Sequence, residues 1–465
     1  MTAEIVLTAA VAANATSLTL SDVSNLPTLG TYTVNVEGEV YTVSAVTGKV
    51  LTVASTSSNS AAHGQSAVVS VVSTLTQVAG IPTPFAQNIG GVGSATQAGA
   101  FANILPPYKA ATSISNATAT LLPRTSAQFA KVRQNIANCN IFCVGDSTTA
   151  GFGTTQFQPG AYPGILPQLL SASGLFANYD SWMGGDNNAS FTREAGDNRI
   201  VKGSGWSVGL QSTLGGSFYT ASAATSDLSF TPTQQVDTFV LWYYRNAGFA
   251  TISWKVNGGS TTNINTANAS AVLGSTTISV PLGFNTLALN WVSGGNAAII
   301  GVQAYNTTKK SVNVAQCGWY GSTTATWNNG QGVYGPLAAL TTIAPDLTII
   351  NLGINNWNGG IGNLPCYLTD MQVIINAALA GGGEVVLMSP NPTGAATSLA
   401  VQQQFVDALA GLAASNNILF YDNWRRMGGV YTANNTNGLM SDTLHPNSAG
   451  YSGVANGLFN IIGSL

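Results

Sequence analysis

Alternation of apolar and polar residues marks the first part of the chain and predicts short β-strands. The alternation covers residues 32–36, 40–46 and 50–53, and dipeptides that end in glycine separate these runs. Short alternating runs divided by such dipeptides are typical of β-hairpins. Residues 1–80 are therefore predicted to form a small all-β module.

The next segment, residues 81–125, has a different pattern. It is rich in Gly, Ala, Ser and Pro and shows little periodicity, which favours a connector over a packed core. A helical pattern begins at residue 127, and an apolar strand is predicted over residues 141–144. Residues 126–186 are thus the first part of an α/β domain.

A second β-rich region lies in the middle of the chain, over residues 187–309. Its predicted strands follow one another at regular intervals, with turns between them, at 238–244, 250–256, 276–280, 286–292 and 298–305. Such spacing predicts a β-sandwich, which we consider a possible carbohydrate-binding module.

The α/β pattern returns in residues 310–465. Buried strands are predicted at 346–352 and 384–388, and helices at 370–379 and 398–414. The fold class is therefore α/β, as one domain interrupted by an inserted sandwich and preceded by the small β module.

Composition narrows the possible functions. The chain has 465 residues with 14 basic and 17 acidic side chains, so 7% are charged while 45% are hydrophobic, which excludes a disordered protein. A net charge of −3 without any Lys/Arg run offers no surface for nucleic acid. Apolar runs fall short of the roughly 18 to 20 residues of a membrane helix. The first twenty residues lack a basic start, so we expect no signal peptide.

Metal and disulfide chemistry are not expected. Four cysteines are too few for a disulfide scaffold, and two histidines without paired CxxC clusters give no indication of a zinc site. We therefore predict no metal and no cofactor.

Ser147 is the first candidate for chemistry. It follows the predicted strand 141–144 in the sequence GDSTTAGFG. A strand-to-helix corner at this point would expose the hydroxyl and aim backbone N–H groups at an adjacent anion. GDS alone is a weak signal because a three-residue match often arises by chance.

Asp442 and His445 form the second candidate, in SDTLHPNSAGY just before a predicted helix over residues 448–462. An aspartate three residues before a histidine can accept from one imidazole nitrogen while the other nitrogen faces a serine. The alternative is that Asp442 caps a turn and His445 is a packed polar residue.

Two further motifs supply candidate donors to an oxyanion. Asn355 lies in NLGINN, at the end of the strand 346–352, where its amide could donate to a developing negative charge. The alternative is an asparagine that only makes a turn. Gly321, in QCGWYGSTT, could present an unhindered backbone N–H.

Together and in this order, the four motifs resemble those of the SGNH hydrolase superfamily, the GDSL-type esterases. The resemblance implies that Ser147 is the nucleophile, His445 the base and Asp442 the group that orients it. It also implies an oxyanion hole formed by Ser147 N–H, Gly321 N–H and Asn355. The implied fold is a flavodoxin-like, three-layer α/β/α domain, and the implied reaction is acyl transfer to water.

Two details depart from the family pattern. Asn356 stands where the family usually has an aspartate in GxND. The sequence WMGGDN also offers Gly184 and Gly185 as the second-motif glycine. We prefer Gly321 because GWYGSTT better resembles the family's GxSGxT run.

The N-terminal module resembles modules of bacteriophage tail and virion proteins. With an esterase behind it, this predicts a tail fibre or tailspike that removes acetyl groups from bacterial surface polysaccharide, outside the cell. Residues 1–125 would contact other virion proteins, and a homo-oligomer, by analogy a trimer, is expected. Trp319 and Trp357 are candidates for stacking on sugar, with core packing as the alternative. A silent glycan-binding adhesin and a lipase-like or thioesterase-like hydrolase are the alternative functions.

Overall fold

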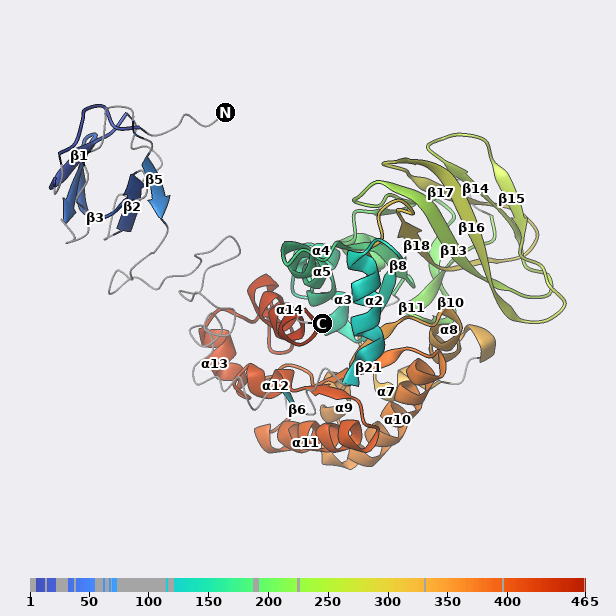
Figure 1. Ribbon diagram of the computed structural model, residues 1–465. Helices are drawn as coiled ribbons and strands as arrows, with labels where there is room; N and C mark the ends of the chain where they lie inside the picture. Colours follow the sequence, from blue (N-terminus) through green and yellow to red (C-terminus); the bar gives the residue numbers. More distant parts are fainter. Residues whose placement is uncertain are drawn as a thin grey trace. The chain divides into compact units, whose positions relative to one another are not determined.

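The protein consists of two compact units, Met1–Ala100 and Phe101–Leu465 (Figure 1). The computed structural model describes residues 6–12, 15–21, 32–36, 39–54, 62, 67, 69–72, 114–115, 121–186, 192–223, 226–329, 332–394, 397–463 and 465. Most of the predicted connector, residues 81–125, therefore lies outside the described residues. Of the helices in the described part, none has the length and apolar character needed to cross a membrane.

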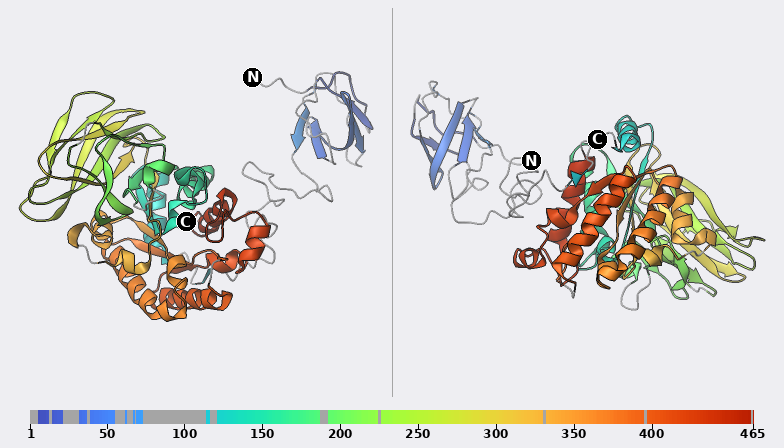
Figure 2. Two further views of the ribbon diagram at one scale, coloured as in Figure 1. Left: turned by 180° about the vertical axis from the view of Figure 1, so that it is seen from behind. Right: turned by 90° about the horizontal axis from the view of Figure 1, so that it is seen from below.

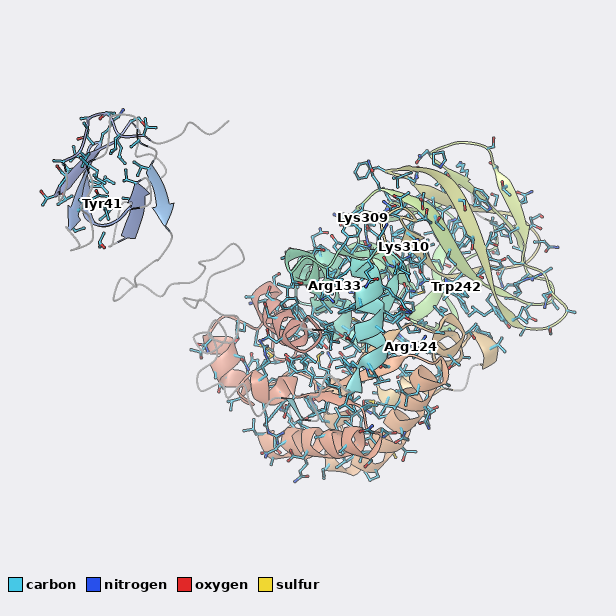
Figure 3. All side chains as sticks on the ribbon, in the orientation of Figure 1. Tyr41, Arg124, Arg133, Trp242, Lys309 and Lys310 are labelled. Carbon is cyan, nitrogen blue, oxygen red and sulfur yellow. The ribbon has the colours of Figure 1, made fainter. Side chains whose placement is uncertain are left out.

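The first unit contains one antiparallel sheet. Its strands, in the spatial order β1-β4-β3-β2-β5, are β1 (Ser17–Thr19), β4 (Val50–Ala54), β3 (Glu39–Thr47), β2 (Tyr32–Val36) and β5 (Val69–Val72). Apolar side chains from alternate strand positions form its core, among them Val34, Tyr41 and Val43, and Tyr41 is labelled in Figure 3. The alternation in the sequence thus corresponds to one buried face of this sheet.

A parallel sheet forms the centre of the second unit. Its order is β8-β19-β7-β20-β21-β22, with β6 (Ile114–Ser115) antiparallel at the edge. The strands are β7 (Cys139–Gly145), β8 (Ala177–Met183), β19 (Val312–Gly318), β20 (Leu347–Asn351), β21 (Glu384–Met388) and β22 (Leu419–Tyr421). Since β19 and β20 flank β7 on opposite sides, the loops after these three strands meet at one edge of the sheet.

Helices cover both faces of this sheet. In β7, Ile141 and Cys143 point toward one helical layer, while Phe142 and Val144 point toward the other. The first layer contains α2 (Pro123–Arg133), α5 (Tyr162–Ala172) and α14 (Ser448–Ile462). The second contains α7 (Thr324–Trp327), α8 (Pro336–Ile343), α10 (Leu364–Ala380) and α11 (Leu399–Ser415), and α10 and α11 run side by side in Figures 1 and 2. The predicted α/β fold class is confirmed.

Short helices connect the main elements. They are α3 (Ser147–Ala150), α4 (Phe157–Gly160), α6 (Arg193–Gly196), α9 (Ile354–Trp357), α12 (Asn423–Arg426) and α13 (Tyr431–Thr436), with 3₁₀ turns at η3 (Gly332–Tyr334) and η4 (Ile361–Asn363). Two of them, α3 and α9, directly follow β7 and β20, so they lie where the loops of the parallel strands meet.

The strands between β8 and β19 in the sequence form two antiparallel sheet layers, which occupy one end of the unit in Figure 1. One contains β10 (Ser207–Thr213), β11 (Gly216–Ala221), β18 (Ala297–Tyr305), β13 (Val236–Arg245) and β16 (Val272–Gly283). The other contains β15 (Thr262–Asn265), β14 (Thr251–Val256), β17 (Leu287–Ser293), β12 (Leu228–Phe230) and β9 (Ile200–Lys202). Apolar side chains of both sheets share one buried cluster.

The inserted strands are continuous with the central sheet. Strand β18 pairs antiparallel with β8, with Gly301 opposite Met183 and Val302 opposite Trp182. Trp242, labelled in Figure 3, is partly buried and donates from its indole nitrogen to Gln303 at 2.8 Å. One sheet of the insert therefore extends the α/β sheet, and the aromatic side chain of Trp242 serves packing.

Candidate active site

Ser147 lies at a tight corner between β7 and α3. A Cβ atom on Gly145 would lie 1.9 Å from Thr149 Oγ1 and 2.6 Å from the Asn351 carbonyl oxygen, so only glycine fits before the corner. Asp146 caps α3 because its Oδ1 accepts the backbone N–H of Thr148 at 2.9 Å and the Thr148 hydroxyl at 2.8 Å. The corner fixes Ser147 at the carboxyl end of the central strand.

Three side chains form a continuous hydrogen-bonded series at this corner. Ser147 Oγ lies 2.9 Å from His445 Nε2, and His445 Nδ1 lies 2.8 Å from Asp442 Oδ2. Asp442 Oδ1 also accepts the backbone N–H groups of Leu444 and His445, each at 2.7 Å. The structure thus brings together the three residues that the sequence nominated as nucleophile, base and orienting carboxylate.

The environment of Asp442 favours its ionised form. Partial burial alone would raise the pKa of Asp442, but hydrogen bonds from the His445 imidazole and from two backbone N–H groups outweigh burial and lower it. An ionised carboxylate accepts from Nδ1–H and so favours the tautomer in which Nε2 accepts the Ser147 hydroxyl hydrogen.

The loop that carries this pair is fixed by backbone bonds on both sides. Met440 and Pro446 form an isolated antiparallel bridge, and Ser441 N–H donates to the His445 carbonyl oxygen at 2.8 Å. From the loop after β21, the Asn391 amide donates to the Leu444 carbonyl oxygen at 2.9 Å. These bonds define the position of His445 independently of any bound ligand.

Gly321 follows β19 in a four-residue turn beside Ser147. Ser322 N–H closes the turn on the Trp319 carbonyl oxygen at 3.1 Å, and Gly321 has φ +70° at its third position. The second residue, Tyr320, is not among the positive-φ residues, so the turn is of type II, which requires glycine at its third position. The Trp319 N–H donates to the Gly145 carbonyl oxygen at 2.9 Å, so the turn starts beside the serine corner.

The alternative glycines have other roles. Gly185 N–H donates to the Ser217 carbonyl oxygen at 2.7 Å, and Gly184 N–H donates to the Ile300 carbonyl oxygen at 2.6 Å. Both follow β8, which is separated from β7 by β19. Gly321, and not Gly185, therefore follows the strand that directly neighbours β7.

Asn355 lies in α9, directly after β20. Its Nδ2 donates to the Ser322 carbonyl oxygen at 2.9 Å, which links the loops after β20 and β19. An amide nitrogen carries two hydrogens, and this bond uses one. The next residue, Asn356, accepts from Thr324 N–H at 3.2 Å and donates to Thr324 Oγ1 at 3.0 Å. A carboxylate could not donate, which gives a physical reason for the amide at position 356.

The two tryptophans nominated for sugar stacking lie in the core, which corrects that expectation. Trp357 has no exposed surface and packs edge-to-face against Phe405, and Trp319 is only 8% exposed and packs edge-to-face against Trp327. Each occupies the apolar cluster beneath the second helical layer. Neither presents a ring face to a ligand.

The sequence interpretation missed two other aromatic residues near the histidine, of which Phe152 contacts its ring and Tyr320 contacts Phe152. The ring of Phe152 lies 4.6 Å from that of His445 and 5.1 Å from that of Tyr320, measured between centroids. Both side chains are half-buried. Phe152 lies five residues after Ser147 and Tyr320 one residue before Gly321, and this nearness to two candidate site residues was the sequence signal that could have indicated them.

Asp146 is a second carboxyl group at the serine corner. It has no exposed surface, and burial raises its pKa to about 6 against the opposing effect of its bonds with Thr148. Groups of three or more side chains suited to hold a metal are absent from the described residues.

The arrangement can perform nucleophilic acyl substitution. It places a serine hydroxyl, an imidazole that accepts from it and a carboxylate that orients the imidazole in one series. Gly321 N–H and the Asn355 amide lie on the two loops adjacent to Ser147, where a developing oxyanion would need donors.

Solved structures with a similar fold include several esterases. The chain is similar to a structure described as a peptidoglycan O-acetylesterase in action, with a TM-score of 0.57 and 16% identity over 76% of this chain and 99% of that one. Weaker likenesses include the acetylxylan esterase Axe2 from Geobacillus stearothermophilus (TM-score 0.27, 19% identity, 33% of this chain and 73% of that one). Another is a family two carbohydrate esterase from Cellvibrio japonicus (TM-score 0.26, 13% identity, 57% and 96%).

Comparison by sequence gives a family for part of the chain. Proteins with curated descriptions yield no match. Residues 289–452 match the GDSL-like Lipase/Acylhydrolase family, a segment that includes Gly321, Asn355, Asp442 and His445 and excludes Ser147. Residues 289–452 are thus similar to the GDSL-like Lipase/Acylhydrolase family, and the fold of the chain is similar to that of a peptidoglycan O-acetylesterase.

Proposed function

We propose that this protein is a serine esterase of SGNH type that removes O-acetyl groups from a bacterial surface polysaccharide. The observation that carries the proposal is the series Ser147–His445–Asp442, with 2.9 and 2.8 Å between successive partners. Its geometry is that of a nucleophile already paired with its base and a base already oriented by a carboxylate.

In the proposed mechanism, Ser147 Oγ attacks the acetyl carbonyl carbon while its proton passes to His445 Nε2. The tetrahedral intermediate places its negative oxygen against Ser147 N–H, Gly321 N–H and the free hydrogen of Asn355 Nδ2. Collapse breaks the bond between the carbonyl carbon and the sugar oxygen, which takes the proton from His445. Water then attacks the acetyl carbonyl carbon while its proton passes to His445, the bond from that carbon to Ser147 Oγ breaks, Oγ takes the proton back from His445, and acetate leaves.

The surroundings of His445 favour a bulky alcohol as the leaving group. The sugar oxygen must approach Nε2 to receive its proton, so the sugar ring lies next to the imidazole. Phe152 lies against the imidazole and Tyr320 against Phe152, and both side chains are half-buried. Aromatic rings have the apolar faces on which sugar rings pack. The fold shared with a peptidoglycan O-acetylesterase supports an acetylated glycan as substrate class.

We further propose that the enzyme is part of a phage tail fibre or tailspike and acts outside, at the host cell surface. The support is the strand pattern of residues 1–80, which resembles modules of virion proteins. Residues 1–125 would join other tail proteins and hold a homo-oligomer, by analogy a trimer, together. Light scattering of the full chain and of a chain without residues 1–125 tests this, because an unchanged number of subunits after truncation would contradict it.

Acetate release tests the esterase proposal directly. Wild type and Ser147→Ala are incubated with O-acetylated capsular polysaccharide, lipopolysaccharide and peptidoglycan, and both acetate and glycan binding are measured. We expect acetate from wild type alone and binding by both proteins. Binding without acetate from either protein would favour the alternative of a silent adhesin.

A chain-length series of p-nitrophenyl esters distinguishes the remaining alternative. Activity that falls steeply beyond the acetyl ester supports a deacetylase. Activity that rises with acyl length would instead support a lipase-like or thioesterase-like hydrolase, which needs a larger apolar cleft.

A further inference from the structure

The turn that carries Gly321 is held by two charged side chains from the segment after β8. The Asp186 carboxylate accepts the backbone N–H of Tyr320 at 3.1 and 3.2 Å. The Arg193 guanidinium donates from Nη2 to the Gly318 carbonyl oxygen at 3.1 Å. Asp186 has no exposed surface and Arg193 is 3% exposed. The two bonds therefore hold the backbone immediately before Gly321 from within the protein.

Arg193 holds the strand end as a whole. Its Nε donates to the Gly184 carbonyl oxygen at 2.6 Å, and its Nη1 donates to Gln316 Oε1. Gln316 in turn donates to the carbonyl oxygen of Ala150, the last residue of α3, at 2.7 Å. Arg193 thus joins β8, β19 and the serine helix, whereas Asp186 acts on the turn itself.

The backbone of Asp186 adopts a conformation that residues other than glycine rarely take. Its φ is +48°, in the left-handed region, which costs a non-glycine residue about 1 kcal/mol or more. A Cβ atom on Gly216 would lie 2.6 Å from Asp186 Cα, so the turn between β10 and β11 packs directly against this backbone. Such a conformation persists where the surroundings impose it, and it often marks a functional position.

Resting on the proposed esterase function, we propose that Asp186 is a positioning residue for the oxyanion hole. Its bond to Tyr320 N–H fixes the first peptide group of the turn from Trp319 to Ser322, and the type II form of that turn then directs Gly321 N–H toward the reacting carbonyl. The next peptide group carries Gly321 N–H and takes its position from the one that Asp186 holds, so loss of the carboxylate lets this donor move away from the reacting carbonyl.

Replacement of Asp186 by glycine measures the effect of removing the carboxylate alone, because glycine adopts a positive φ without steric cost. We expect Asp186→Gly to lower kcat for p-nitrophenyl acetate by about 10- to 100-fold. This loss is smaller than that caused by removal of an oxyanion donor, because Gly321 N–H is displaced and not removed. KM should stay within about twofold, since the interaction lost belongs to the transition state. Asp186→Asn keeps an acceptor oxygen and should restore kcat to within about fivefold of wild type.

A small alkylboronic acid shows whether the loss lies in the oxyanion hole. Its boron bonds to Ser147 Oγ while the hydroxyl proton passes to His445, and the resulting anion resembles the tetrahedral intermediate. The inhibition constant should rise in parallel with the loss of kcat/KM in Asp186→Gly and recover in Asp186→Asn. Tryptophan fluorescence and circular dichroism establish that each variant is folded.

The outcomes separate the two proposals. Wild-type kcat in Asp186→Gly, or a reduced kcat with unchanged boronate affinity, would overturn the role of Asp186 while leaving the esterase intact. A wild-type protein without esterase activity on any ester would overturn both. If Asp186→Gly does not fold, Asp186→Glu is used instead, because it displaces the carboxylate by one methylene. We expect the same parallel loss of kcat/KM and of boronate affinity.

Discussion

The pH dependence of stability should change when Asp146 is replaced by asparagine. Burial raises the pKa of Asp146 from 3.8 to about 6, so the folded state holds its proton more tightly than the unfolded chain. The stability that this group contributes is therefore fully present below pH 3.8 and is lost as the pH rises through 6. A shift of this size corresponds to about 3 kcal/mol. Asparagine keeps the Oδ1 acceptor for Thr148 and cannot ionise.

We expect the stability of Asp146→Asn relative to wild type to increase by about 2.5 kcal/mol between pH 4 and pH 7.5, slightly less than the full effect because the unfolded carboxyl is already partly ionised at pH 4. Urea unfolding of the full chain measures this by tryptophan fluorescence, because all nine tryptophans lie in the Phe101–Leu465 unit. Asp407→Asn, at a side chain that is 53% exposed, is the matched control and should show little change. A stability difference between Asp146→Asn and wild type that stays constant over this range would refute the argument.

Three further predictions concern the site. Asn355→Ala should lower kcat for p-nitrophenyl acetate by about 10²- to 10³-fold with little change in KM, and an effect confined to KM in steady-state kinetics would contradict its oxyanion role. Asp442→Asn should lower kcat by about 10³- to 10⁴-fold because it no longer enforces the required His445 tautomer; a smaller loss than tenfold would speak against that role. Gly145→Ala should destabilise the fold by about 1 to 3 kcal/mol through its clash with Thr149, measured by thermal unfolding. Gly362→Ala, where a Cβ meets nothing within 4 Å, is its control.

The hydrophobic pattern of the sequence predicted the helices and strands that consist mainly of apolar residues, and it missed strands that contain buried polar residues. The predicted strand 384–388 coincides with β21, and the predicted helix 448–462 coincides with α14. Strands β8 and β19 were not predicted, because each contains buried polar residues. Asp180 in β8 accepts the Thr233 N–H at 2.6 Å, and Asn313 in β19 accepts from the Asn178 amide at 2.9 Å. Polar groups satisfied by distant partners interrupt the apolar pattern on which strand prediction relies.

Some residues of the candidate site were likewise predicted from the sequence, and others were not. Ser147, Asp442 and His445 were nominated because short motifs keep their chemistry within a few residues. Trp319 and Trp357 were wrong as sugar platforms because nearness to a motif in the sequence does not specify which face of a strand end a side chain takes. Asp186 was missed because its partner, Tyr320, lies 134 residues away, beyond any local pattern.

The register of the central sheet explains how the loops that carry Gly321 and Asn355 come to lie beside Ser147. Gly145 pairs with Gly318 on one side and with Asn351 on the other, so β7, β19 and β20 end level with one another. Both glycines are required by α3, since a Cβ on Gly318 would lie 2.2 Å from Ala150 N just as one on Gly145 would meet Thr149. A slip of one residue would reverse the faces of an entire strand and place side chains under α3. The serine helix therefore selects the register that also brings Gly321 and Asn355 beside Ser147, which lets the domain accept a large insert before β19 without losing its site.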